Sequence, residues 1–246
     1  HDDVMDKAEV RRGRPTVHIQ WNENTAILSG DQMMIEAYKL LAEVPADKLH
    51  KVLRLFNEMA TEICEGQQYD VDFESQEHVT IEEYLKMIRL KTSVLLATAL
   101  QIGSYLAGAN EAQQEALYQF GINVGLAFQI QDDILDVWGD PKTFGKAVGG
   151  DISCNKKTYV YLTAQQLADA ELAEELHQWY GSVLDDNTEK IAAVKGIFEQ
   201  LNVRAACEAV VEEYTQKALL ILDTLPQNAA TEQLRQLANK LNTRKD

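Results

Sequence analysis

Residues 110–139 read NEAQQEALYQFGINVGLAFQIQDDILDVWG, a stretch without proline between a good helix start and a good helix stop. The Asn110 side chain can cap a helix N-terminus, and Gly139 is typical of a helix end. The stretch therefore predicts one long helix that ends at about Trp138. Only four prolines occur in 246 residues, where an average usage of about 5% would give roughly twelve. Long helices are therefore expected throughout the chain.

Helix signals recur from end to end. Thr80 and Glu83 have the spacing of a capping box and open a helix predicted at 80–107. Asn24 or Thr25 is the expected cap of the first long helix. Alternating strand patterns are essentially absent, and no repeat or linker divides the chain. The sequence thus predicts an all-α fold in a single domain, residues 1–246, with further helices at 25–44, 47–65, from 163 onward, 188–201, 203–222 and 231–241.

Charge and cysteine content restrict the partners and the compartment. The formal net charge of −16 argues against nucleic acid and against an anionic membrane surface, because both attract basic proteins. The longest uncharged run, residues 92–110, contains polar residues and is interpreted as a buried core helix, so no stable membrane insertion is expected. The three cysteines are widely spaced, which favours a reducing compartment, and we expect a cytoplasmic protein.

The same acidic pattern occurs twice, as DDVMD at residues 2–6 and DDILD at residues 132–136. On a helix, the first and last aspartates of each motif project from nearly the same face. Clustered carboxylates repel one another, and a divalent cation with oxygen ligands would remove that repulsion. The alternative is an ordinary solvated acidic face. Counting back from Asp136 in helical steps gives Asp132, Phe128, Gly125 and Gly121. The aspartates thus lie at the end of a stripe of apolar and small residues, which favours a metal site at the rim of an apolar cavity over a solvated face.

Basic residues follow both acidic motifs. Arg11 and Arg12 come after the first motif, and Lys146, Lys156 and Lys157 come after the second. Arginine and lysine are the usual ligands of phosphate groups. A diphosphate cannot contact six aspartates directly, since one like-charge pair at 4 Å costs about 4 kcal/mol at an effective dielectric near 20. The pattern therefore predicts a polyphosphate site in which cations lie between the substrate and the aspartates.

With these motifs the chain resembles the trans-isoprenyl diphosphate synthases of the polyprenyl synthetase family. The paired DDxxD motifs, one followed by Arg-Arg-Gly and the other preceded by Phe-Gln, are specific in combination. The resemblance covers residues 1 to about 161. The stretches that carry it are HDDVMDKAEVRRGRPTVH, LSGDQMMIEAY, EGQQYD, LKTS, FQIQDDILDVWGDPKTFGKAVGGDI and NKKTY.

The resemblance implies a helical bundle around a central cavity, the isoprenoid synthase fold, usually built as a homodimer. It also implies a Mg²⁺-dependent prenyltransferase, with about three ions per site, that condenses isopentenyl diphosphate head-to-tail with an allylic diphosphate. The reaction would proceed by ionisation, condensation and elimination, and an apolar cavity would keep water from the carbocation. The expected product is a short all-trans prenyl diphosphate of C15 to C20.

The resemblance also assigns roles to individual residues. The catalytic groups that would face the carbocation are Lys91, Thr92 and Gln129. The substrate-binding residues would be Arg11, Arg12, Gln67, Lys91, Lys146 and Lys156, with Asp70 and Asp151 also lining the site. The metal-binding residues would be Asp2, Asp3, Asp6, Asp132, Asp133 and Asp136.

One feature of the family is missing from the sequence. Members carry a Gly-Lys-x-x-Arg segment upstream of the first DDxxD motif, and nothing here matches it, so we expect N-terminal helices of the intact protein to precede His1. Three alternatives stay open. A class I terpene cyclase shares the fold and the first motif, and a non-catalytic subunit of a heteromeric synthase would explain the missing segment. A helical HD-type phosphohydrolase rests only on His1-Asp2.

Overall fold

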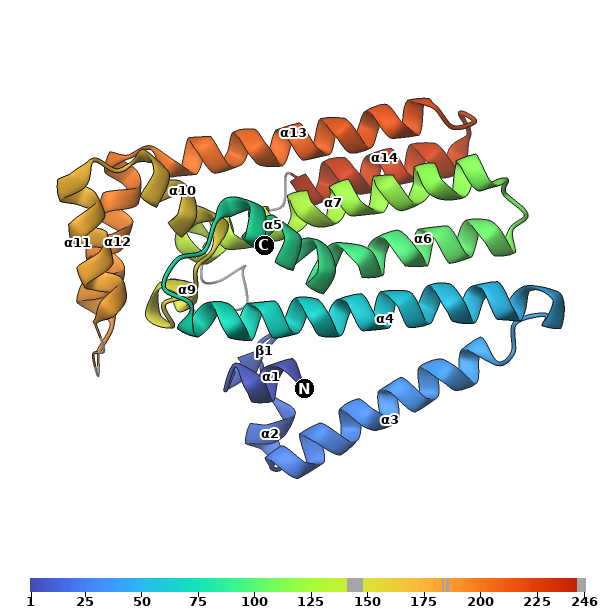
Figure 1. Ribbon diagram of the computed structural model, residues 1–246, viewed down its shortest axis with the longest axis horizontal. Helices are drawn as coiled ribbons and strands as arrows, with labels where there is room; N and C mark the ends of the chain where they lie inside the picture. Colours follow the sequence, from blue (N-terminus) through green and yellow to red (C-terminus); the bar gives the residue numbers. More distant parts are fainter. Residues whose placement is uncertain (141–147, 183, 185, 243–246) are drawn as a thin grey trace.

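The computed structural model describes residues 1–140, 148–182, 184 and 186–242 and confirms the all-α prediction (Figure 1). Five helices make up the main bundle, in which α7 packs against α6, α13 and α14, α13 packs against α14, and α4 packs against α6 (Figure 1). Their bounds are Ala46–Ser75 for α4, Val94–Leu106 for α6, Glu111–Trp138 for α7, Ala229–Asn242 for α14 and Val203–Asp223 for α13.

The remaining elements complete the fold. The first acidic motif begins the chain near α3, which diverges from α4, and α11 and α12 pair at one end of the bundle (Figure 1). The N-terminal elements are α1 (Asp2–Met5), β1 (Val10–Arg11), β2 (Arg14–Pro15), α2 (Val17–Gln20) and α3 (Glu23–Leu41). The others are α5 (Ile81–Ile88), the π-helix η1 (Arg89–Ser93), α9 (Gly150–Ser153), α10 (Tyr159–Leu167), α11 (Ala170–Gly181) and α12 (Thr188–Gln200).

The core is built around α7, which packs against α6 on one side and α13 on the other. Gly121 allows α6 to approach closely and Gly125 allows η1 to do so, because a Cβ on Gly121 would overlap the backbone of Ala97 and one on Gly125 that of Ser93. The stripe that leads to the second acidic motif is therefore partly a packing seam against α6 and η1. The position of the motif at the rim of an apolar cavity stays a prediction.

Local signals placed several helix starts correctly. The capping box of Thr80 and Glu83 is present, and Asn110 caps α7 by accepting a hydrogen bond from the Gln113 N–H. The first long helix begins earlier than predicted, since Asn22, not Asn24 or Thr25, is the cap residue of α3. The helix expected from Thr163 onward is α10, which Thr158 caps.

Two helices differ from their predicted extents because of tertiary contacts. The helix predicted at 47–65 continues as α4 to Ser75, where the polar sequence gives no signal but Phe73 packs into the core. The single helix predicted at 80–107 is interrupted by the π-helix η1. A π-helical turn is rare and frequently marks a functional site, and this one carries Lys91 and Thr92.

In the described part of the chain (Figure 1), no helix is both long enough and apolar enough to cross a bilayer.

Gly66 sets how closely α4 approaches η1. A Cβ at Gly66 would overlap the backbone of Leu90 and Lys91. We predict that Gly66→Ala lowers the free energy of unfolding by about 2 kcal/mol, because overpacking a tight contact forces the backbone apart. Urea denaturation measures the change.

Gly196→Ala is the matched control, because nothing lies within 4 Å of a Cβ there and Gly196 is inside α12. It should stabilise the protein by about 0.5–1 kcal/mol. Equal effects of the two substitutions would contradict this account of α4 packing.

Candidate functional site

The first acidic motif is held between α3 and the β1–β2 hairpin. The His1 ring lies over Gly30, with Nε2 2.8 Å from the Ile27 carbonyl oxygen and 3.3 Å from Asp31. From the other side, Arg11 pairs with Asp3 at 2.5 Å and with Asp2 at 3.3 Å. The start of the motif is therefore held from two sides, and Arg11 lies where the sequence predicted a basic partner.

Two lysines connect this motif to α4. Lys91 Nζ lies 2.8 Å from Asp70 and 3.3 Å from Asp2. Lys156 Nζ lies 3.2 Å from the same oxygen of Asp70 and 3.2 Å from Asp6. Asp70 thus sits between two ammonium groups, and each lysine also contacts one end of the first acidic motif.

Burial and charge act in opposite directions on this cluster. Burial alone would raise the pKa of Asp70, but Lys91 and Lys156 outweigh it and lower that pKa. Burial likewise disfavours the charged lysines, yet Asp70 and the first motif raise the pKa of both Lys91 and Lys156. All three groups are therefore charged at neutral pH.

One carboxylate oxygen stands out within the first motif. Asp2 Oδ1 is buried and accepts no hydrogen bond, although the Lys91 ammonium lies 3.3 Å away. A buried charged oxygen without a hydrogen bond is costly. Within the described residues its cationic partner is Lys91.

The second acidic motif has two buried aspartates and one that is partly exposed. Asp133 is buried, and its Oδ2 accepts hydrogen bonds from the Tyr84 hydroxyl at 2.5 Å and the Tyr159 N–H at 3.0 Å. Burial raises the pKa of Asp133 to about 7, even though these hydrogen bonds act to lower it. Asp136 is also buried and accepts the Asp151 N–H at 3.1 Å. Asp132 is partly exposed.

The catalytic residues predicted from the resemblance do come together. The Thr92 hydroxyl donates to Gln129 Oε1 at 3.1 Å, and Gln129 Nε2 donates to Asp133 Oδ1 at 3.4 Å. Lys91 precedes Thr92 and contacts the first motif. Two adjacent residues of η1 therefore lead to the two acidic motifs, Lys91 to the first and Thr92, through Gln129, to the second. Tyr84, which orients Asp133, was missed, because no single-sequence signal pairs a tyrosine with a carboxylate 49 residues away.

The other predicted residues lie in varied places. Arg12 is exposed in the hairpin turn with a left-handed φ of 53°, and Gln67 lies near Met5. Lys157 points away from the lysine pair and donates to the Phe73 carbonyl oxygen. Lys146 lies outside the described residues. Within the described part of the chain, no three Asp, Glu, His or Cys side chains are close enough to hold a metal by themselves.

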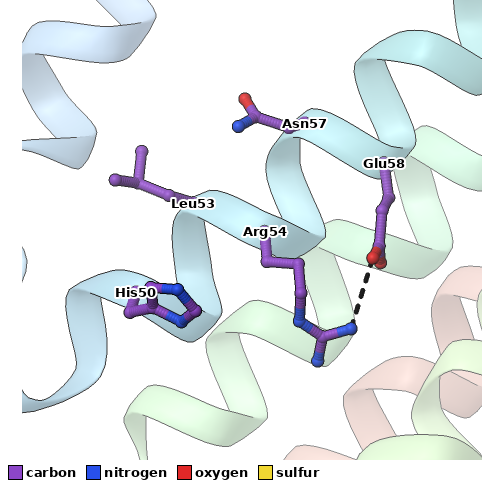
Figure 2. Close-up of a pocket in the computed structure, with 5 residues that line it drawn as sticks. All are labelled: His50, Leu53, Arg54, Asn57 and Glu58. Atoms are coloured by element: carbon purple, nitrogen blue, oxygen red, sulfur yellow. Dashed lines mark hydrogen bonds and ion pairs between the residues drawn. The ribbon is translucent and has the colours of Figure 1, made fainter.

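Two surface hollows flank α4, and neither includes an acidic motif. The one in Figure 2, about 370 Å³, is lined by five residues of α4, and Arg54 and Glu58 form an ordinary surface ion pair at 3.2 Å. The other, about 600 Å³, lies between α4, α6 and α7. The charged cluster around Asp70, not either hollow, is the candidate functional site.

The family model for polyprenyl synthetases matches residues 1–201 of the chain. The chain belongs to the polyprenyl synthetase family. A short chain isoprenyl diphosphate synthase from Methanocaldococcus jannaschii is 42% identical over 183 residues, 74% of this chain and 56% of that protein. The chain thus spans little more than half of this family member.

Solved structures of the family have the same fold. A geranylgeranyl pyrophosphate synthase superposes with a TM-score of 0.93 at 46% identity, covering 100% of this chain and 76% of the other. A second one, from Corynebacterium glutamicum in complex with isoprenyl diphosphate and magnesium, gives 0.91 at 29% identity, with 99% and 74% coverage. The isoprenoid synthase fold expected from the sequence is confirmed.

Asp70 offers a test of the charged cluster. We predict that Asp70→Asn lowers the free energy of unfolding at pH 7 by about 2 kcal/mol, less than the 3–5 typical of fully buried pairs because both lysines are partly exposed. Since the folded-state pKa of Asp70 is lowered, its contribution is complete above the usual value of 3.8 and is lost as the pH falls through the folded pKa.

The difference in the free energy of unfolding between the wild-type protein and Asp70→Asn should therefore shrink below about pH 4, as measured by urea denaturation across pH. Asp72→Asn, at an exposed position of the same helix, should change stability by less than about 0.5 kcal/mol. A constant difference at all pH values would contradict the proposed ion pairing.

Proposed function

We propose that the intact protein is a prenyltransferase that condenses isopentenyl diphosphate head-to-tail with an allylic diphosphate. The observation that carries the proposal is that Lys91 and Lys156 contact the first acidic motif, while their neighbours Thr92 and Asp151 lead by hydrogen bonds to the second. The family relationship supports it, since its matched members are isoprenyl diphosphate synthases. Such a cluster suits a substrate that is strongly anionic and that arrives with its own cations.

The acidic residues fit Mg²⁺, which takes carboxylate oxygens and completes its shell with substrate phosphates. Asp2 and Asp6 would hold ions from one side and Asp132 from the other, and the Asp2 oxygen that accepts no hydrogen bond supports this assignment. Bound Mg²⁺, three ions in our proposal, would supply positive charge that stabilises the departing diphosphate. Asp133 and Asp136 would orient neighbouring groups, because their oxygens already accept protein hydrogen bonds.

The chain's own residues would divide the remaining work. Lys91, Lys156 and Arg11 would bind the allylic diphosphate, exchanging carboxylate partners for phosphate oxygens. The Gln129 amide and the Thr92 hydroxyl would face the carbocation formed when the diphosphate leaves. Arg12, exposed at the hairpin turn, would contact isopentenyl diphosphate.

A prenyl chain growing from this position would pass along α6. Leu96 lies one helical turn beyond Thr92, and Leu95 beside it is 52% exposed. Small residues continue this face at Ala99 and Gly103. These apolar and small side chains would contact the growing chain, for which we propose a length of C15 to C20.

The direct test is incubation of the intact protein with isopentenyl diphosphate, an allylic diphosphate and Mg²⁺, followed by chromatography of the products. We expect a longer all-trans prenyl diphosphate and release of pyrophosphate. Asp2→Asn and Asp132→Asn should each lower kcat/KM by about 10²–10³-fold, because each removes electrostatic stabilisation of the leaving group.

Asp223→Asn is the control, since Asp223 is exposed and pairs with Arg235 away from the site. Hydrocarbon products from a single diphosphate would instead indicate a cyclase. Activity only with a second protein would indicate a non-catalytic subunit.

We further propose that the intact protein is a cytoplasmic homodimer that uses the exposed face of α3. Leu28, Met33 and Leu40 on this helix are 66%, 73% and 70% exposed. Large apolar side chains exposed to this extent along one helix are typical of an interaction surface. Figure 1 shows that α3 diverges from α4.

Met33→Glu should convert a dimer of the intact protein into a monomer in sedimentation velocity, because a charge would be buried at the interface. Leu220→Glu, at a 64% exposed position of α13, should leave the dimer intact. A monomeric unmodified protein would rule the proposal out and would mean that another part of the intact chain covers α3.

A further inference from the structure

Lys190 on α12 is a charged side chain in the core. It is 0% exposed. Its Nζ donates hydrogen bonds to Oδ1 of Asn155 at 2.5 Å and to the carbonyl oxygen of Ser182 at 3.3 Å. A buried ammonium group is costly unless it is hydrogen-bonded. Its position calls for an explanation beyond packing, since a leucine or methionine would fill the space without that cost.

The partner of Lys190 is a residue with an unusual backbone conformation. Asn155 has a left-handed φ of 57°, which asparagine tolerates better than most residues. The next residue is Lys156, whose N–H donates to the Asp151 carbonyl oxygen at 2.9 Å. Holding the Asn155 side chain therefore fixes where the Lys156 side chain begins.

The neighbour of Lys190 contacts the other end of the same turn. Gly149 has a φ of 82°, and a Cβ added there would lie 2.8 Å from Ile191 Cγ2. The Gly149 N–H also donates to the Asp136 carbonyl oxygen at 2.7 Å. Lys190 thus contacts Asn155 and Ile191 contacts Gly149. These are the two left-handed residues of the segment 149–156, which we call the α9 turn.

The α9 turn contacts both acidic motifs. Its Asp151 N–H donates to Asp136 of the second motif at 3.1 Å. Its Lys156 contacts Asp6 of the first motif and Asp70 of α4, both at 3.2 Å. A shift of this turn by an ångström would break these contacts together.

We propose that Lys190 is a positioning residue that acts through Asn155 to hold the α9 turn, and with it Lys156, in register with both acidic motifs. Its consequence for substrate binding rests on the proposed function. Its structural consequence does not, and the two can be measured separately.

The structural consequence is measured by hydrogen exchange of the intact protein without substrate. Lys190→Met keeps the unbranched apolar part of the side chain and removes the donor. We expect amides of residues 149–158 to exchange about tenfold faster, while α13 is unchanged. Lys195→Met, on the same helix, should leave exchange in the α9 turn as it is.

The functional consequence is measured with inorganic pyrophosphate and Mg²⁺ by calorimetry, and with kcat/KM for condensation. Loss of a hydrogen bond to a charged group predicts about tenfold weaker pyrophosphate binding in Lys190→Met. The Asn155→Gly background keeps the left-handed φ but lacks the side-chain amide. In that background, Lys190→Met should weaken pyrophosphate binding by less than about twofold.

Unchanged exchange in the α9 turn of Lys190→Met would overturn the inference, and so would equal binding losses with and without Asn155. If Lys190→Met does not fold, Asn155→Gly alone decides, since it should show the same faster exchange. A wild-type protein that neither binds pyrophosphate nor forms product contradicts the proposed function, whereas exchange still decides the role of Lys190.

Discussion

The candidate site depends on one electrostatic arrangement, in which Asp70 lies between the ammonium groups of Lys91 and Lys156. The lysines come from η1 and from the segment after α9, and each also contacts the first acidic motif. Without Asp70 the two ammonium groups would repel each other, and like charges at such distances cost several kcal/mol away from bulk water. The arrangement keeps the site charged and assembled. It also keeps cationic donors ready for a substrate that brings phosphate oxygens and metal ions.

Close helix packing puts these charges in place. Gly66 brings α4 against η1, and Gly125 brings α7 against the same segment. The π-helical turn then places Lys91 beside α4 and Thr92 beside α7. A regular helix through this segment would rotate the two side chains relative to each other. The backbone of the core and the electrostatics of the site are therefore not independent.

Much of this could be predicted from the sequence, because the relevant signals are local. The DDxxD motifs, the capping residues Thr80 and Asn110 and the scarcity of proline each act within a few residues. The π-helical turn, the inward orientation of Asp133 and the burial of Lys190 could not be predicted. Each depends on contacts between residues far apart in the sequence, such as Tyr84 with Asp133 or Lys190 with Asn155. The stripe through Gly121 and Gly125 shows the same limit, since small residues serve a cavity wall and a helix seam equally well.

The central claim is that both acidic motifs serve one diphosphate through bridging cations. It is tested most directly by a crystal structure of the intact protein with Mn²⁺ and inorganic pyrophosphate, in which anomalous scattering locates the metal ions. The account predicts metal ions bound by Asp2 and by Asp132 on opposite sides of one pyrophosphate, with Lys91 and Lys156 on its oxygens. Metal ions confined to one motif, or a pyrophosphate bound elsewhere on the protein, would contradict it.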